Sequence, residues 1–344
     1  LYLSRYALPR PARWTSSLAY VLSARLAKSK DQTVLGTVSW FPWMMIAIEE
    51  LVRKPSWRSG TLLGVVVGTD LLAGYPPNCF RNLVALAIVF VYEVVVVLPA
   101  DRGERRAHLW RLTKSMGLAV VVAVALTAPM LMGLLDTYTG SIRAALPMHE
   151  VLRSSLEVGD ALMALVPALR APNSLPLLYM GIIPALLALV ALTQANGRRL
   201  LWGGLALLFF LWACGGHSFV LPLTARVLSP FKLFRIPEQY LFVSCFFVCV
   251  LAAHGMHDLL RAPRLRRRLA WILGIVGVLT LFGLLFHQLA SRPPRELPAA
   301  KLSVLMLLGA GLCLWGLGGK PRRARVAAWL CVPLLLLDLG VQLR

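Results

Sequence analysis

The sequence predicts an all-α fold, a polytopic transmembrane helix bundle with about eleven membrane segments. Hydrophobic residues make up 58% of the 344 residues, and the mean hydropathy is +0.71. Charged residues make up only 15%, and they cluster in short stretches between long apolar runs. A soluble domain of this length needs more polar surface. Apolar runs in lipid form helices because each helix satisfies its own backbone groups.

Membrane segments are expected wherever about 20 residues form an apolar run, because a helix of that length spans the hydrocarbon core. The first such run is short and contains Arg13 and Arg25, so it either crosses the membrane or lies in the interface. The whole chain is expected to form one transmembrane domain. The predicted segments are 12–27, 34–51, 61–76, 81–99, 116–135, 177–194, 200–217, 239–258, 269–290, 302–318 and 326–343.

Basic loops predict the orientation, because Lys and Arg concentrate in short loops on the cytoplasmic side of a membrane. The arginine-rich stretch 259–268 is the strongest such loop. The alternation of segments then places the N-terminus in the cytoplasm and the C-terminus outside. The other predicted cytoplasmic stretches are the N-terminal residues and loops 52–60, 100–115, 195–199 and 319–325.

Two long loops, 136–176 and 218–238, are predicted on the outer side. Loops of this length are uncommon unless they fold on their own or carry a function. Within the first of them, residues 147–170 have apolar side chains at helical spacing. This pattern predicts an amphipathic helix that lies on the outer membrane surface.

The net charge of +21 does not indicate nucleic-acid binding. Proteins that bind nucleic acid gather Lys and Arg on one soluble face. Here the basic residues lie between apolar segments, where the orientation of the chain explains them. The same residues are expected to attract anionic lipid headgroups.

The six cysteines predict neither a disulfide framework nor a zinc site, because most lie in apolar runs and no CxxC pair occurs. His254, His257 and Asp258 have the spacing of metal ligands on a helix. They also lie at an inner helix end, where the helix dipole favours histidine. No cofactor is expected, and nothing in the sequence supports a divalent metal.

Acidic residues within or beside apolar runs are costly and therefore need a partner or a function. Asp70 lies near the outer end of its segment, and Asp136 opens the first long outer loop. Either could reach a polar cavity and act as a catalytic carboxylate. Glu93 and Asp338 lie within apolar segments, where a structural hydrogen bond or a neutral carboxyl explains them.

The stretch Phe231–Gln239, FKLFRIPEQ, has the strongest character of a binding site. It places Arg235 and Glu238 immediately before a membrane helix, with Pro237 suited to the first turn. A helix N-terminus favours anions, and arginine binds phosphate through two parallel bonds. We expect a phosphate-bearing ligand at the outer membrane face, with His217 as a further polar candidate. An interfacial Arg–Glu pair is the alternative.

At these residues the chain resembles the YfhO-like family of bacterial membrane proteins. The runs SPFKLFRIPEQYLF and VLAAHGMHDLL are similar to the family's FRxPxRxLF and LAGxGxxxL signature. Further similar stretches follow the family order along essentially the whole chain, namely SWFPWMMIAIEELVRKP, LLAGYPPNCF, APMLMGLLDTYTGSIR and WACGGHS.

The resemblance implies a GT-C-like fold in the bacterial inner (cytoplasmic) membrane. It implies a glycosyltransferase that moves a sugar from a polyprenyl-phosphate carrier onto an acceptor outside the cytoplasm. The motif positions carry over to Arg235, Pro237, Glu238, Gly74, Pro76, Ser141 and Arg143. Arg235 is the first candidate for the lipid phosphate and Arg143 the second.

The chain departs from the family pattern at three positions. Tyr75 replaces the usual His, Pro77 the Gln, and Gln239 the second Arg of the signature. These replacements put individual substrate contacts in doubt, and Tyr75 is kept as a binding candidate.

Two other functions remain open at this point. The chain starts without Met and ends beside an apolar run, so we expect it to be a fragment of a longer protein. The outer-loop Asp that GT-C enzymes use would then precede Leu1. Without it, the chain is a non-catalytic membrane subunit that packs against protein partners. A transporter is the second alternative, supported mainly by Glu93.

Overall fold

The computed structural model describes residues 1–23, 32–99, 101–139, 147–156, 180–194, 196–262, 326 and 328–336. All regular structure in these ranges is helical, which confirms the all-α prediction. The helices fall into two compact units, each built from segments that are separate in the sequence. Unit 1 comprises Leu1–Tyr2, Ser29–Ser155 and Ser218–Val243, and unit 2 comprises Leu3–Lys28, Leu156–His217 and Ser244–Arg344.

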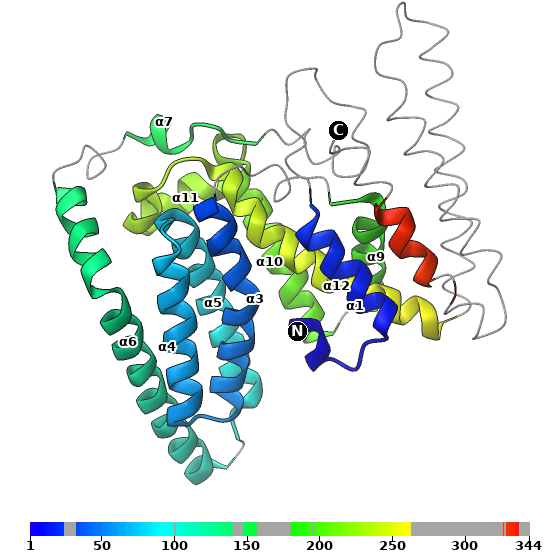
Figure 1. Ribbon diagram of the computed structural model, residues 1–344, viewed down its shortest axis with the longest axis horizontal. Helices are drawn as coiled ribbons and strands as arrows, with labels where there is room; N and C mark the ends of the chain where they lie inside the picture. The colour runs from blue at the N-terminus through cyan, green and yellow to red at the C-terminus, as the bar shows by residue number, and fades with distance from the viewer. Residues whose placement is uncertain are drawn as a thin grey trace, which may run out of the picture. The chain divides into compact units, whose positions relative to one another are not determined.

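Unit 1 is built around four helices that run up and down beside one another (Figure 1). They are α3 (Gln32–Arg53), α4 (Trp57–Leu72), α5 (Pro76–Val97) and α6 (Arg102–Thr139). Local sequence sets where these helices begin. Ser56 forms a capping box with Ser59 at the start of α4, and α5 begins at Pro76, whose missing N–H costs nothing in a first turn.

Glycines draw α4 against α6. Gly60, Gly64 and Gly68 recur at every fourth position, so they lie on one face of α4. A Cβ atom added at Gly64 would lie 2.6 Å from the backbone oxygen of Ala119. The two backbones therefore approach more closely than any larger residue would allow, as small residues permit in membrane helices.

Short helices of unit 1 gather near the end of the bundle at which α5 begins. They are α7 (Met148–Val151), α11 (Val220–Val227), η5 (Ser229–Leu233) and η6 (Pro237–Tyr240), the last of which leads directly into α12 (Leu241–Arg261). Aromatic rings hold this group to α5. The ring of Phe80 lies edge-on to Phe231, with the centroids 5.1 Å apart.

Unit 2 contains η1 (Tyr2–Arg5) from Leu3 on, α1 (Arg10–Val21), α9 (Ile182–Thr193), α10 (Gly197–Ala213), η4 (Gly215–His217) and α12 from Ser244 on. Its core contains Ala12 of α1, Leu187 of α9 and Ala252 of α12, all buried. Gly255 permits the closest approach, because a Cβ there would collide with the backbone oxygen of Leu187.

Among the described residues, three helical stretches are long and apolar enough to cross a membrane, Pro76–Val97, Arg102–Leu134 and Pro237–Arg261. These stretches confirm a membrane protein with several apolar helices, while the count of about eleven segments stays a prediction. Segments 269–290 and 302–318 lie outside the described residues, and 326–343 is described only in part. At the first predicted segment, α1 has 12 residues and ends at Val21.

One predicted loop is wrong. Residues 100–115 were expected to connect two segments, but α6 already begins at Arg102. The side-chain oxygen of Asp101 accepts a bond from the backbone N–H of Glu104 and caps the new helix start. The stretch is rich in charged residues, so hydropathy starts the membrane segment only at 116, while its Arg, Glu, Leu and Lys residues favour helix.

Candidate functional site

The first turns of α5 carry a polar face on a mostly apolar helix. Asn78, Arg81 and Asn82 stand three and four residues apart, which places them on one side of the helix. All three are buried, and Arg81 is only 1% exposed. A buried charge of this kind needs several bonding partners, and the structure supplies them.

Arg81 binds the segment that precedes α12. One terminal nitrogen of its guanidinium donates to Asn78 Oδ1 at 2.9 Å and to Gln239 Oε1 at 2.8 Å. The other donates to the backbone oxygens of Arg235 at 3.2 Å and Ile236 at 3.3 Å. The guanidinium also lies 4.8 Å from the ring centre of Tyr240. A residue of α5 therefore fixes the course of residues 235–240.

Ile236, the second of the two residues whose carbonyls Arg81 binds, has a strained backbone. Its φ is +65°, in the left-handed region that a β-branched side chain rarely adopts. Strain of this kind costs about 1–3 kcal/mol and persists only where the surroundings enforce it. Here Arg81 holds the carbonyl of Ile236 and that of the preceding Arg235, and Pro237 fixes the next φ. The side chain of Arg235 leaves the backbone at this held point.

Gln239 and Tyr75 are direct partners. The amide nitrogen of Gln239 donates to the hydroxyl oxygen of Tyr75 at 2.6 Å, while its amide oxygen accepts from Arg81. Tyr75 is the cap residue of α5, immediately after Gly74 with its positive φ of 84°. Two of the three positions at which the chain departs from the family pattern therefore meet in one hydrogen bond.

Arg235 is 37% exposed, and its guanidinium lies 3.6 Å from Glu150 Oε2 of α7. The same carboxylate lies 3.9 Å from Arg153. The sequence offers a local ion pair between Arg235 and Glu238 as the alternative. In the structure Arg235 pairs instead with Glu150, which lies 85 positions earlier in the sequence. The side chain is partly exposed, and an anion that bound its guanidinium would compete with Glu150.

Asp70 lies beneath this cluster and is fully buried. Its two carboxylate oxygens accept from the amide nitrogen of Asn82 at 3.2 and 3.4 Å. Asn82 also donates to the backbone oxygen of Thr37, and Asn78 donates to the Thr37 hydroxyl. Asp70 therefore ties α4 to α5 and α3, and a substrate in solvent does not reach it in this conformation.

The remaining candidates lie apart from this cluster. Asp136 is exposed in the last turn of α6 and belongs to the helix, although the sequence placed it at the start of a loop. His217 is exposed at the end of η4 in unit 2. Arg143 and Ser141 lie outside the described residues, as does most of the predicted helix 147–170. Of that helix, the structure shows the single turn α7.

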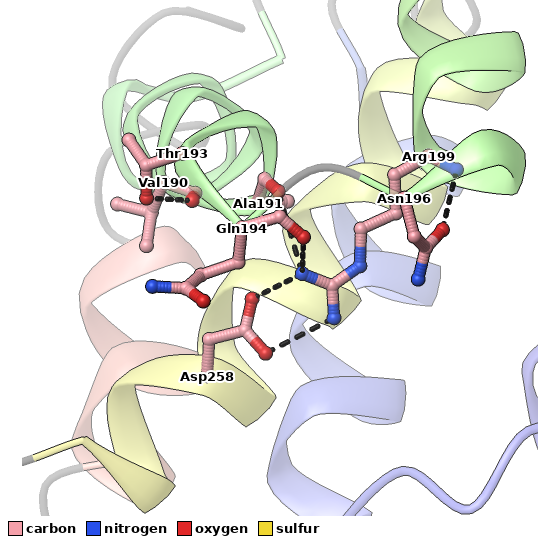
Figure 2. Close-up of polar contacts among 7 residues, drawn as sticks. All are labelled: Val190, Ala191, Thr193, Gln194, Asn196, Arg199 and Asp258. Atoms are coloured by element: carbon pink, nitrogen blue, oxygen red, sulfur yellow. Dashed lines mark hydrogen bonds and ion pairs between the residues drawn. The ribbon is translucent and has the colours of Figure 1, made fainter.

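Unit 2 holds a second buried charge cluster (Figure 2). The guanidinium of Arg199 donates to both carboxylate oxygens of Asp258, at 2.5 and 3.0 Å, and to the backbone oxygen of Gln194 at 3.0 Å. It thereby binds the end of α9 to the end of α12. Both carboxylate oxygens of Asp258 accept bonds from Arg199, so Asp258 is not free to bind a metal together with His254 and His257. His254 packs on the ring of Trp202, with the centroids 4.9 Å apart.

Glu93 also has a structural explanation. Its carboxylate is buried and lies 3.8 Å from the guanidinium of Arg53, which is 3.5 Å from Glu49 as well. The Tyr2 hydroxyl donates to Glu49 at 2.8 Å. This ion-pair group accounts for a charge deep in an apolar helix, and the main support for a transporter is thereby weakened.

Helices of membrane-spanning length, with their buried charges held in pairs, define an α-helical integral membrane protein. The chain belongs to the family of the bacterial membrane protein YfhO, whose family model matches residues 5–343. Comparisons with curated proteins and with solved structures find no match to this chain.

Sequence reasoning missed Arg81, Asn78, Asn82 and Glu150. The first three had a readable signal, because PPNCFRN places polar residues at helical spacing immediately after the prolines that start α5. Glu150 had no such signal in the sequence, because its partner Arg235 lies 85 positions later in the chain.

Proposed function

We propose that this protein is a membrane glycosyltransferase that uses a polyprenyl-phosphate-linked sugar and glycosylates an acceptor outside the cytoplasm. One observation supports it most. Arg81 holds the backbone at 235–236, so that the partly exposed side chain of Arg235 leaves the chain at a fixed place and its guanidinium pairs with Glu150. A positioned guanidinium is suited to bind the phosphate of the donor and to stabilise the charge that develops when this phosphate leaves.

Glu150 gives the proposed site a second role. In the resting protein its carboxylate neutralises Arg235. A donor phosphate that binds Arg235 displaces this carboxylate, which then lies beside the ligand. There it accepts the proton of the acceptor hydroxyl as the acceptor oxygen attacks C1 of the sugar. The C1–O bond to phosphate breaks, and the phosphate leaves on its lipid. Glu150 thus joins Asp70 and Asp136 as a candidate base, and it is the one that contacts Arg235.

The orientation that this proposal needs follows from the basic loops. The Arg235 cluster lies at the end of the unit 1 bundle opposite to Arg53 and Lys54. If basic residues mark the cytoplasmic side of the inner membrane, Arg235 faces outward, where lipid-linked sugars and their acceptors meet.

Replacing Arg235 with Lys tests the proposal. Lysine keeps the charge but loses the planar fork that binds phosphate through two bonds. We expect the R235K variant, reconstituted in liposomes in its full-length form, to lose transfer from a polyprenyl-phosphate sugar by about 10- to 100-fold, the effect of about 1.4–2.8 kcal/mol. Arg226→Lys is the matched control, since Arg226 is an exposed arginine of the same unit. Unchanged transfer by R235K contradicts the proposal.

A non-catalytic membrane subunit is the second candidate function, and α11 favours it. Phe219, Leu223 and Val227 recur at every fourth position, and their exposed fractions are 79%, 55% and 74%. An apolar stripe of this kind suits a partner helix. Phe219→Ser together with Leu223→Ser should then release a co-purifying membrane protein, whereas transfer by the isolated chain excludes this function.

A further inference from the structure

A single carboxylate oxygen lies between two arginines in unit 1. Oε2 of Glu150 is 3.6 Å from the guanidinium of Arg235 and 3.9 Å from that of Arg153. A charge-assisted hydrogen bond between such groups is shorter, about 2.7–2.9 Å. Neither ion pair is therefore closed by a hydrogen bond, and one carboxylate stands against two positive charges.

Other described residues do not satisfy the polar atoms of this group. Glu150 Oε2 and Arg235 Nε are both buried, and neither has a hydrogen-bond partner among the residues that the structure describes. A buried polar atom without such a bond costs free energy. The excess positive charge and the unused donor together favour an anion with several oxygens, such as a phosphate group, beside Arg235.

Backbone strain lies next to both arginines. Ser154 has a φ of +60° and Ile236 one of +65°, and within the described ranges these are the non-glycine residues with a positive φ. Each of them directly follows one of the two arginines that approach Glu150. Strained residues cluster at ligand sites, where the surrounding structure enforces the strain. This coincidence distinguishes Arg153 from an ordinary surface arginine.

The two arginines reach Glu150 in different ways. Arg153 belongs to the same local turn, because its backbone N–H donates to the backbone oxygen of Glu150 at 3.3 Å. Arg235 comes from a distant segment, whose backbone is bound by Arg81. The buried side chain of Val151 anchors α7 between these groups. A ligand that takes Arg235 from Glu150 therefore leaves the local pair of Glu150 with Arg153 intact.

We propose that Arg153 is a positioning residue that receives the carboxylate of Glu150 when a phosphate group binds Arg235. The inference rests on the proposed function, in which Glu150 gives way to the donor phosphate. Without a second arginine, the displaced carboxylate would lie unpaired beside a group of the same charge. Arg153 offsets this repulsion. Glu150 is thus a competitor that the ligand displaces over a short distance only, and it stays where the proposed base has to lie.

Phosphate binding tests this inference. The full-length protein in phosphatidylcholine nanodiscs is titrated with undecaprenyl phosphate and, separately, with inorganic phosphate. Glu150→Gln removes the competitor, so the affinity should rise about two- to fivefold, the effect of a partly exposed ion pair. Arg153→Gln leaves Glu150 with Arg235 alone, so the affinity should fall by a similar factor, and Arg153→Lys should restore most of it. Arg226→Gln and Glu104→Gln, at exposed positions of the same unit, are controls that should change nothing.

The double variant E150Q/R153Q distinguishes two roles of Arg153. If Arg153 acts through Glu150, the double variant should bind phosphate as tightly as E150Q does. A lower affinity of the double variant means that Arg153 contacts the phosphate itself, and this result overturns the inference. An unchanged affinity of E150Q for both probes overturns it as well. The expected pattern with undecaprenyl phosphate alone supports a lipid headgroup as the ligand, and the same pattern with inorganic phosphate supports a free anion.

The proposed function fails in a different way. In sugar transfer, E150Q should lower KM and kcat together, because the donor binds more tightly while the acceptor loses its base. A protein that shows the binding responses and transfers no sugar retains the role of Arg153 and loses the enzyme. A protein that transfers sugar and binds phosphate equally in the wild type and E150Q retains the enzyme and overturns the inference.

Discussion

Arg81 and Gln239 are joined by a hydrogen bond of 2.8 Å although 158 positions separate them in the sequence. Both side chains are buried. The contact makes the start of α5 and the short helix η6 one structural element within unit 1. Because the same guanidinium holds the carbonyls of Arg235 and Ile236, the position of the proposed phosphate ligand depends on a residue of α5, far away in the sequence.

Replacing Arg81 should therefore disturb Arg235 at a distance. Arg81→Met leaves several buried acceptors without a donor, each costing about 1–3 kcal/mol. We expect a markedly lower free energy of unfolding, measured by SDS titration in mixed micelles. The milder Arg81→Lys should fold and bind undecaprenyl phosphate more weakly. Arg58→Lys, at an exposed arginine of α4, should change neither quantity. Unaltered binding by R81K contradicts the link between Arg81 and Arg235.

Tyr75 and Gln239 should be coupled in stability. Tyr75→Phe removes the acceptor of the 2.6 Å bond, and Gln239→Leu removes its donor. A double-mutant cycle on the free energy of unfolding should give a coupling of about 0.5–1.5 kcal/mol. A coupling free energy of zero would mean that Tyr75 and Gln239 contribute to stability independently of each other.

Replacing one partner of the Arg199–Asp258 pair should lower the free energy of unfolding more than replacing both. Asp258→Leu leaves the guanidinium of Arg199 buried without its carboxylate, and loss of one partner of such a pair costs about 3–5 kcal/mol. The double variant Arg199→Met, Asp258→Leu should recover part of this loss. Arg261→Met is the control, at an exposed arginine of the same helix. The prediction is contradicted by a double variant that is less stable than Asp258→Leu alone.

Glycine should be required at position 64 and dispensable at position 117. A leucine at 64 would collide with the backbone of α6, whereas a Cβ at Gly117 meets nothing within 4 Å. We expect Gly64→Leu to lower the thermal midpoint strongly. Gly117→Ala should leave it unchanged or raise it slightly, because alanine is the better helix former by about 1 kcal/mol. Equal midpoints for the two variants would show that α4 and α6 do not pack through this face.

Accessibility labelling tests the orientation. The basic loops predict that position 264 faces the cytoplasm and that the segment 218–238 faces outward. Single cysteines at 229 and 264, in a background without the native cysteines, are treated with an impermeant maleimide on intact cells. We expect labelling at 229 only. Labelling at 264 from outside would reverse the topology and place Arg235 on the cytoplasmic side.

The sequence predicts the fold class well because hydropathy is a property of each segment alone. The helices at 34–51 and 239–258 were predicted within a few residues of α3 and α12. The starts of α4 and α5 lie four and five residues earlier than predicted, because polar residues such as Ser59 and Asn78 at the helix starts conceal them from a hydropathy criterion. Their signals are capping residues and proline, which act locally.

The site was predicted only in part, for a different reason. Arg235 was recognised because the residues that make it notable are its neighbours in sequence. Its partner Glu150, and Arg81, which positions it, come from other helices, and a single sequence carries no signal that pairs them. The partnership of Tyr75 with Gln239 likewise depends on tertiary packing. Local chemistry can be predicted from the sequence, whereas long-range pairing requires the fold.

The length of α6 has a mechanical consequence. This helix has 38 residues and is about 57 Å long, against a hydrocarbon core of about 30 Å. We expect Trp110, which is 62% exposed and has Lys114 4.7 Å from its ring centre, to lie at the level of the headgroups. The two helical turns before Trp110 then extend beyond the lipid surface, and Asp101 caps the start of this extension. A protein that docks at Asp101 would thus be held about 12 Å above the headgroups by helix geometry alone. Shortening this helical extension by one turn would bring the docked protein about 5 Å closer to the membrane.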